Sequence, residues 1–159
     1  MAKTMRISYF GHDSSDAAIR KRIRVFQSYG YEIDGFMNRR RNGPDPEWNN
    51  YELGETENGA YFNRILSVFK GAFRATKQKQ KLAASDLIIA RNLDMLATAF
   101  LTLRLTSLKK PVVYECLDIH RLLCRQDAVG WMARKTEGFL LRRSLGGIVS
   151  AIWRLVSTT

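Results

Sequence analysis

The chain has 159 residues, 45% of them hydrophobic, which suits one domain with a buried core and excludes a disordered chain. Its net charge of +11 attracts nucleic acid, anionic membranes and phosphorylated substrates alike, so charge alone does not choose a partner. No run of about 18 apolar residues and no signal-peptide segment occurs, so we expect a cytoplasmic protein without a transmembrane helix.

The first 36 residues predict a strand, a helix and a second strand. Residues 6–10 form a β-prone run that ends at Gly11, and the polar residues 12–16 supply a capping signal for a helix. Apolar residues then recur at helical spacing as far as Tyr29, and Gly30 is a natural end for that helix. Residues 32–36 follow as the second strand. This is the repeating unit of a parallel sheet.

A polar loop over residues 38–60, around a short strand at 48–53, leads to a predicted helix at 61–80. We expect the apolar stripe of this helix to cover the sheet, as in an ordinary amphipathic helix. The stripe consists of Phe62, Ile65, Leu66, Phe69 and Phe73. The cations on its polar side match a helix that lies on an anionic membrane surface, and the candidates for that contact are Arg74, Lys77, Lys79 and Lys81.

The remainder of the chain continues to alternate between strands and helices. Strands are predicted at 86–90 and 111–115, with a helix at 95–107 between them. A helix at about 128–143 and a last strand at 152–157 complete the order. Such alternation predicts an α/β fold with an open, mostly parallel, Rossmann-like sheet and helices on both faces.

In such a sheet, ligands bind beyond the carboxyl ends of the strands, which here are followed by residues 11–13, 91–92 and 117–120. The turn after the first strand has one glycine and matches neither a dinucleotide fingerprint nor a P-loop, so we assign no cofactor to these residues. It remains open whether this turn binds an anion at the helix N-terminus or is a plain capped turn.

Two other clusters have simpler explanations. Cys116, His120 and Cys124 are spaced four apart, but a structural zinc site needs four ligands and the preceding residues predict a strand, so we assign no metal site. The run Arg39–Arg41 lacks interleaved aromatic residues and is best explained as a solvated charge run. We therefore do not expect nucleic acid to be a partner.

Four segments, at 6–34, 85–100, 109–123 and 136–144, together resemble the N-terminal domain of bacterial glycosyltransferases of the two-domain GT-B architecture, in family four of the retaining enzymes. The resemblance is greatest to those of exopolysaccharide (succinoglycan-type) biosynthesis. It implies that residues 1–159 form a single acceptor-side domain. The sugar-nucleotide domain, which carries the paired catalytic glutamates, is then absent, so this chain alone is expected to be inactive and no catalytic residue is assigned within it.

The resemblance also implies candidate residues for the cleft. Gly11, His12 and Asp13 match the loop after the first strand, and Arg91 and Asn92 match that after the fourth. Asp118 and His120 match the loop after the fifth, where many relatives have His-Asp; a pair that only caps the loop is the alternative. Glu47 and Glu55 have the spacing of the paired-glutamate signature, but they fall in an early loop, and we interpret this as chance.

Two functional hypotheses follow. In the first, the chain is the acceptor half of an enzyme that transfers a hexose from a sugar nucleotide to a lipid-linked saccharide at the inner face of the cytoplasmic membrane. Its basic surface would then lie near the lipid that carries the acceptor. In the second, the chain is a non-catalytic basic α/β module that binds an anionic membrane surface or RNA.

Overall fold

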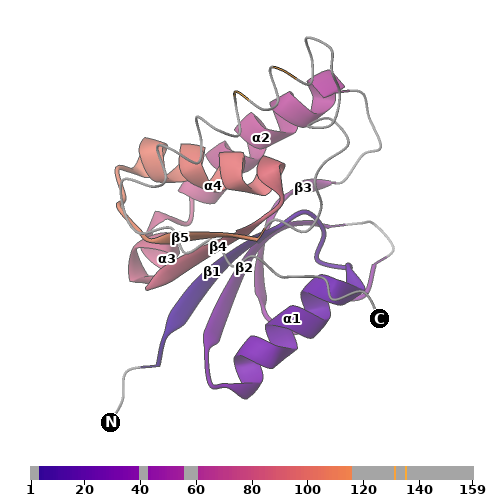
Figure 1. The fold of residues 1–159 in the computed structure, drawn as a ribbon, viewed down its shortest axis with the longest axis vertical. Coiled ribbons are helices and arrows are strands. Elements are labelled where there is room, and N and C mark those ends of the chain that lie inside the picture. The colour runs from indigo at the N-terminus through magenta and orange to yellow at the C-terminus, as the bar shows by residue number, and fades with distance from the viewer. Residues whose placement is uncertain (1–3, 40–42, 56–60, 116–130, 132–134, 136–159) are drawn as a thin grey trace.

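The computed structural model describes residues 4–39, 43–55 and 61–115, together with Trp131 and Lys135, which are helical (Figure 1). Five strands form one sheet in the order β3-β2-β1-β4-β5, and every neighbouring pair is parallel. Their bounds are β1 Arg6–Gly11, β2 Glu32–Arg39, β3 Asn49–Glu55, β4 Leu87–Arg91 and β5 Val112–Glu115. The predicted open, parallel, Rossmann-like sheet is therefore confirmed.

Helices cover both faces of this sheet. On one face, α1 (Ala17–Ser28) packs Ile19 and Ile23 against Ile7, Tyr9 and other apolar residues of the strands. On the other face lie α2 (Tyr61–Thr76), α3 (Lys79–Ala84) and α4 (Leu93–Thr106), over a core that includes Phe10, Phe36 and Leu96 (Figure 1). The helix and strand predicted at 128–143 and 152–157 lie outside the described residues, except for Trp131 and Lys135.

The chain reverses its direction of travel across the sheet between β1 and β4. From β1 it proceeds through α1 to β2 and then to β3, and it returns to the other side of β1 to form β4 and β5. The chain therefore leaves β1 toward one face of the sheet and leaves β4 toward the other, and the two loops begin side by side at the carboxyl edge. This is the switch point at which open α/β sheets bind their ligands.

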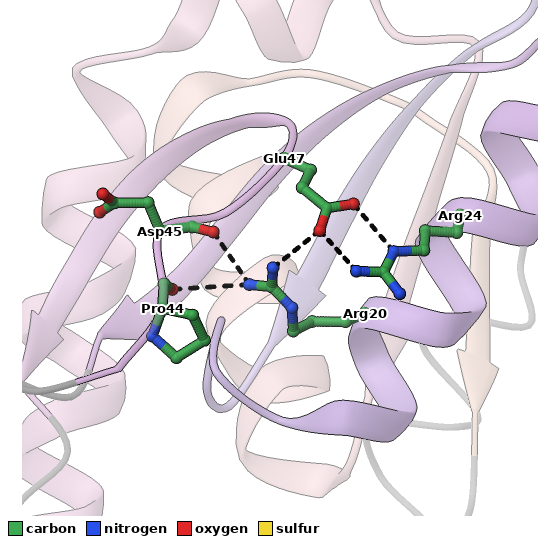
Figure 2. A network of polar contacts seen from close by, with 5 residues as sticks. All are labelled: Arg20, Arg24, Pro44, Asp45 and Glu47. Carbon is green, nitrogen blue, oxygen red and sulfur yellow. Dashed lines mark hydrogen bonds and ion pairs between the residues drawn. The ribbon is translucent and has the colours of Figure 1, made fainter.

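Helix α1 is fixed at its start and along its outer side. Asp16 caps it, because its carboxylate accepts hydrogen bonds from the backbone N–H groups of Ala18 (2.8 Å) and Ile19 (2.9 Å). Glu47, in the loop before β3, binds the guanidinium groups of both Arg20 and Arg24 (Figure 2). Glu47 therefore has a structural role, in agreement with the interpretation that its spacing from Glu55 is chance.

The prediction for the helix at 61–80 is wrong in its bounds and in its packing. The helix is interrupted after Thr76 and continues as the separate helix α3. The apolar stripe does not cover the sheet either, since Ile65, Leu66, Phe69 and Phe73 are all exposed. Instead, the small residues Gly71, Ala72 and Ala75 form the buried face of α2.

The reason lies in the partner of α2, which packs beside α4 as well as against β3. At this contact α4 presents Thr98 and Thr102, whose hydroxyls each donate to a backbone carbonyl four residues earlier. A Cβ on Gly71 would lie 3.4 Å from Cγ2 of Thr98. Because the two helices approach this closely, large side chains of α2 are excluded from the contact and turn outward.

Candidate functional site at the carboxyl edge of the sheet

The loops that follow β1 and β4 come together at the carboxyl edge. The side-chain amide of Asn92, after β4, lies 3.3 Å from Nδ1 of His12, after β1. On the other side of the ring, Nε2 of His12 lies 3.4 Å from the carboxylate of Asp16. These contacts bring together two of the three loops that the sequence assigns to a cleft.

His12 acts here as a positioning group. Its two ring nitrogens face the Asn92 amide and the Asp16 carboxylate, so the ring connects the loop after β4 with the start of α1. Burial raises the pKa of the Asp16 carboxyl, but the backbone N–H of Ile19, the charge of His12 and further donors outweigh it and lower the pKa overall. Asp16 therefore stays ionised and holds the imidazole in place.

Asp13 and Gly11 shape the first loop. Asp13 is buried, and its carboxylate accepts a hydrogen bond of 2.8 Å from the backbone N–H of Ser15. Gly11 lies where a Cβ would approach the side chains of Ile19 and Met37 to within 3.0 and 3.2 Å. The absence of a side chain at residue 11 therefore lets the end of β1 pack closely against Ile19 of α1 and Met37 of β2.

Asn92 has a strained backbone. Its φ of 75° and ψ of 159° lie in a region that is populated almost entirely by glycine, although it is the N-cap residue of α4. Its side chain makes no capping hydrogen bond and reaches His12 instead. Strain of this kind, which costs about 1–3 kcal/mol, tends to occur at functional sites.

Behind this edge lies a second polar cluster, which extends to β5. The hydroxyl of Tyr9 donates to Oε2 of Glu115 at 2.7 Å, and Oε1 of Glu115 pairs with Arg22 of α1 at 2.7 Å. Burial, followed by the charge of Glu115, raises the pKa of Tyr9, while the nearby Arg91 opposes this shift. The Tyr9 hydroxyl is therefore a stable donor.

Several polar atoms at this edge are buried without a hydrogen-bond partner among the described residues. The Arg91 side chain is only 6% exposed, yet its Nε has no partner, and the hydroxyls of Ser14 and Ser15 also have none. Buried polar groups are nearly always hydrogen-bonded in folded proteins, so these atoms mark places where water or a ligand is needed. With His12 and Asn92 they define the candidate site.

The sequence-based site residues fall into three groups. The structure brings His12, Arg91 and Asn92 to one edge, with Gly11 and Asp13 as the scaffold of the first loop. Asp118 and His120 lie outside the described residues, as do Cys116 and Cys124. Arg74 lies on α2, Lys79 and Lys81 lie on α3, and Lys77 lies between the two helices.

Sequence reasoning missed Tyr9, Asp16, Arg22 and Glu115 as members of the site. A signal for Glu115 was present, because it is a charged residue at the last position of a half-buried strand. The pairing of Tyr9 with Glu115 follows only from the strand order, which places β1 and β5 on either side of β4.

A separate cavity of about 650 Å³ lies at the opposite, amino edge of the sheet, lined by Arg6, Glu32, Asp34, Trp48, Lys81 and six other residues. We place the candidate site at the carboxyl edge instead. The chain reverses there, the strained Asn92 lies there, and open α/β sheets bind their ligands at that edge.

Comparison with known proteins finds a similar protein of exopolysaccharide synthesis. The chain is 36% identical over 139 residues to the succinoglycan biosynthesis protein ExoL of Rhizobium meliloti (strain 1021). The match covers 86% of this chain but only 34% of the relative, so the chain spans about a third of the length of the curated relative that it matches. No family model matches the chain. The chain is thus similar over most of its length to part of a protein of exopolysaccharide synthesis.

Proposed function

We propose that the chain is the acceptor-side, N-terminal half of a two-domain retaining glycosyltransferase of exopolysaccharide biosynthesis. The observation that carries the proposal is the 36% identity over 139 residues to a succinoglycan biosynthesis protein. The parallel sheet, with polar loops at its switch point, supports the proposal, because a fold of this kind binds its ligands at that edge. In this proposal, the sugar nucleotide is bound by a second domain that these 159 residues do not include.

The reaction would be the transfer of a hexose from a sugar nucleotide to a saccharide carried on a lipid diphosphate. A hydroxyl oxygen of the acceptor forms a bond to the anomeric carbon as the bond from that carbon to the nucleoside diphosphate breaks. The hydroxyl proton passes to the departing diphosphate. Net transfer therefore needs no redox partner.

In this mechanism the described residues bind and orient the acceptor. Its hydroxyls can accept hydrogen bonds from Arg91 and donate to carboxylates, while His12 and Asn92 hold the two loops at a fixed separation. Correct placement of the attacking hydroxyl is a large part of catalysis in a two-substrate reaction. We therefore expect variants of this edge to impair transfer without abolishing folding.

The test is an assay of the complete reading frame that contains these residues. Nucleotide sugars labelled in the hexose are supplied with membranes that carry polyprenyl-diphosphate-linked saccharides. We expect label to enter the lipid fraction, and we expect the 159-residue chain alone to transfer none. Failure of the complete protein with every nucleotide hexose would overturn the proposal, whereas transfer by the 159 residues alone would refute the division between two domains.

A His12→Ala variant of the complete protein tests whether the site lies at the carboxyl edge. We expect its rate of transfer to fall by at least about tenfold, because the β1 and β4 loops lose their connection. Lys21→Ala, on the exposed side of α1, is the matched control and should keep the wild-type rate. Equal rates for both variants, with unchanged melting temperatures, would show that the site lies elsewhere.

A further inference from the structure

Helix α2 carries two different apolar faces. Its small residues, among them Gly71, Ala72 and Ala75, are buried against α4 and β3. Four large apolar side chains, Ile65, Leu66, Phe69 and Phe73, are between 45% and 66% exposed. At 3.6 residues per turn, these four lie within an arc of about 100°, separate from the buried face. We call these four residues the apolar face of α2.

The apolar face is not needed to hold α2 in place, because the small-residue face already makes the contact with the rest of the domain. α2 lies beside α4, on the side of the sheet opposite α1 (Figure 1). Clusters of large exposed apolar side chains are uncommon on monomeric proteins and mark surfaces that another molecule covers. The remaining question is which kind of molecule this is.

The charged residues within α2 and α3 and between them are all of one sign. Residues 61–85 contain six Lys and Arg residues and no Asp or Glu: Arg64, Lys70, Arg74, Lys77, Lys79 and Lys81. Lys70 lies within α2 next to the apolar arc and is exposed, and Lys77 follows the end of the helix. An apolar stripe in a segment whose charged residues are all cations is complementary to the acyl chains and phosphates of an anionic bilayer.

We propose that the apolar face of α2 docks on an anionic membrane surface, with its four side chains among the lipid chains and with Lys70 and Lys77 against the headgroup phosphates. Arg74 contributes charge, although its guanidinium also donates to the backbone carbonyl of Leu53 at 2.8 Å. Lys81 lines the cavity at the amino edge and is not part of this surface. None of the described helices is long and apolar enough to cross a bilayer, so the contact is with the surface.

The proposal goes beyond sugar transfer and does not depend on it, because vesicles alone provide the readout. The chain is sedimented with vesicles of phosphatidylglycerol and phosphatidylcholine and, separately, with vesicles of phosphatidylcholine alone. We expect binding to the anionic vesicles and little to the neutral ones. Equal absence of binding to both kinds of vesicle would overturn the proposal.

Two double variants separate the apolar from the ionic contribution. Phe69→Ser with Phe73→Ser removes two side chains that are more than half exposed, so the fold should persist, and we expect vesicle binding to weaken by at least about tenfold. Lys70→Glu with Lys77→Glu should abolish the preference for anionic lipid.

Matched controls lie on α1 and directly after it, on the opposite face of the sheet. Tyr29→Ser removes an aromatic ring that is 75% exposed, and Lys21→Glu reverses an exposed cation, so both should bind vesicles as the wild type does. If the Phe69/Phe73 variant binds like the wild type, the apolar face is not the docking surface. The same conclusion follows if size-exclusion chromatography shows that the wild type is a dimer and this variant a monomer, and if the wild-type dimer does not bind vesicles.

Discussion

The strain at Asn92 can be separated from the function of its side chain. Glycine adopts the observed φ of 75° without penalty, so Asn92→Gly should be at least as stable as the wild type. Asn92→Ala keeps the strain, and we expect its free energy of unfolding to be about 1 kcal/mol lower than that of Asn92→Gly. Denaturant titration of the two variants measures this difference. If the alanine variant is the more stable, the backbone conformation is not strained.

Glu47 is the residue for which pH has a predictable effect. The hydrogen bond from Arg24, and then the charges of Arg24 and Arg20, lower its pKa to about 2 from the usual 4.5. Because the pKa is lower in the folded state, the stabilisation is complete above pH 4.5 and is lost as pH falls toward 2. We expect Glu47→Gln to reduce the denaturation midpoint at pH 7 but to match the wild type near pH 2.

The comparison is repeated in an Arg20→Ala/Arg24→Ala background, which removes the two partners of Glu47 shown in Figure 2. There, Glu47→Gln should have little effect at any pH. Since the carboxylate is nearly half exposed, solvent screening keeps the effect small, so pH dependence is the diagnostic result rather than its size. If the difference in denaturation midpoint between the wild type and Glu47→Gln does not change with pH, this account is wrong.

Among the helices, the contact between α2 and α4 shows why helix packing was harder to predict than helix position. The apolar spacing in residues 61–76 correctly marked a helix, because periodicity depends on the chain alone. Which side of the helix is buried depends on its partner. The threonines of α4 leave room only for small residues, and this constraint belongs to residues some 30 positions away.

Gly71 tests this packing. A methyl group at residue 71 would lie 3.4 Å from Thr98 and 3.6 Å from Leu53, which is close to ordinary van der Waals contact. Because alanine favours a helix interior over glycine, Gly71→Ala should stabilise the protein by about 0.5–1 kcal/mol. Gly71→Leu should separate the helices and lower the denaturation midpoint. If both substitutions stabilise the protein, the helices are not in close contact.

For the domain as a whole, the alternation of short apolar runs with helical periods was enough to predict a parallel Rossmann-like sheet, because few other arrangements bury such strands. The carboxyl-edge loops followed from that fold, so the positions of His12, Arg91 and Asn92 at that edge could be predicted. The hydrogen bond between Tyr9 and Glu115 could not be predicted from the sequence, since it requires the order β1-β4-β5 across the sheet. Fold-level rules thus located the edge, and tertiary contacts supplied its partners.

The net charge of +11 draws any polyanion to the molecule, so attraction alone cannot identify a membrane contact. Salt separates the possibilities, because screening weakens the attraction between exposed charges but leaves apolar insertion in place. As salt rises, we expect binding to RNA to disappear and binding to anionic vesicles to fall to a plateau. The Phe69→Ser/Phe73→Ser variant should lose that plateau and retain only a weaker, salt-sensitive binding. Binding to RNA that survives high salt would instead favour a nucleic-acid partner for this basic surface.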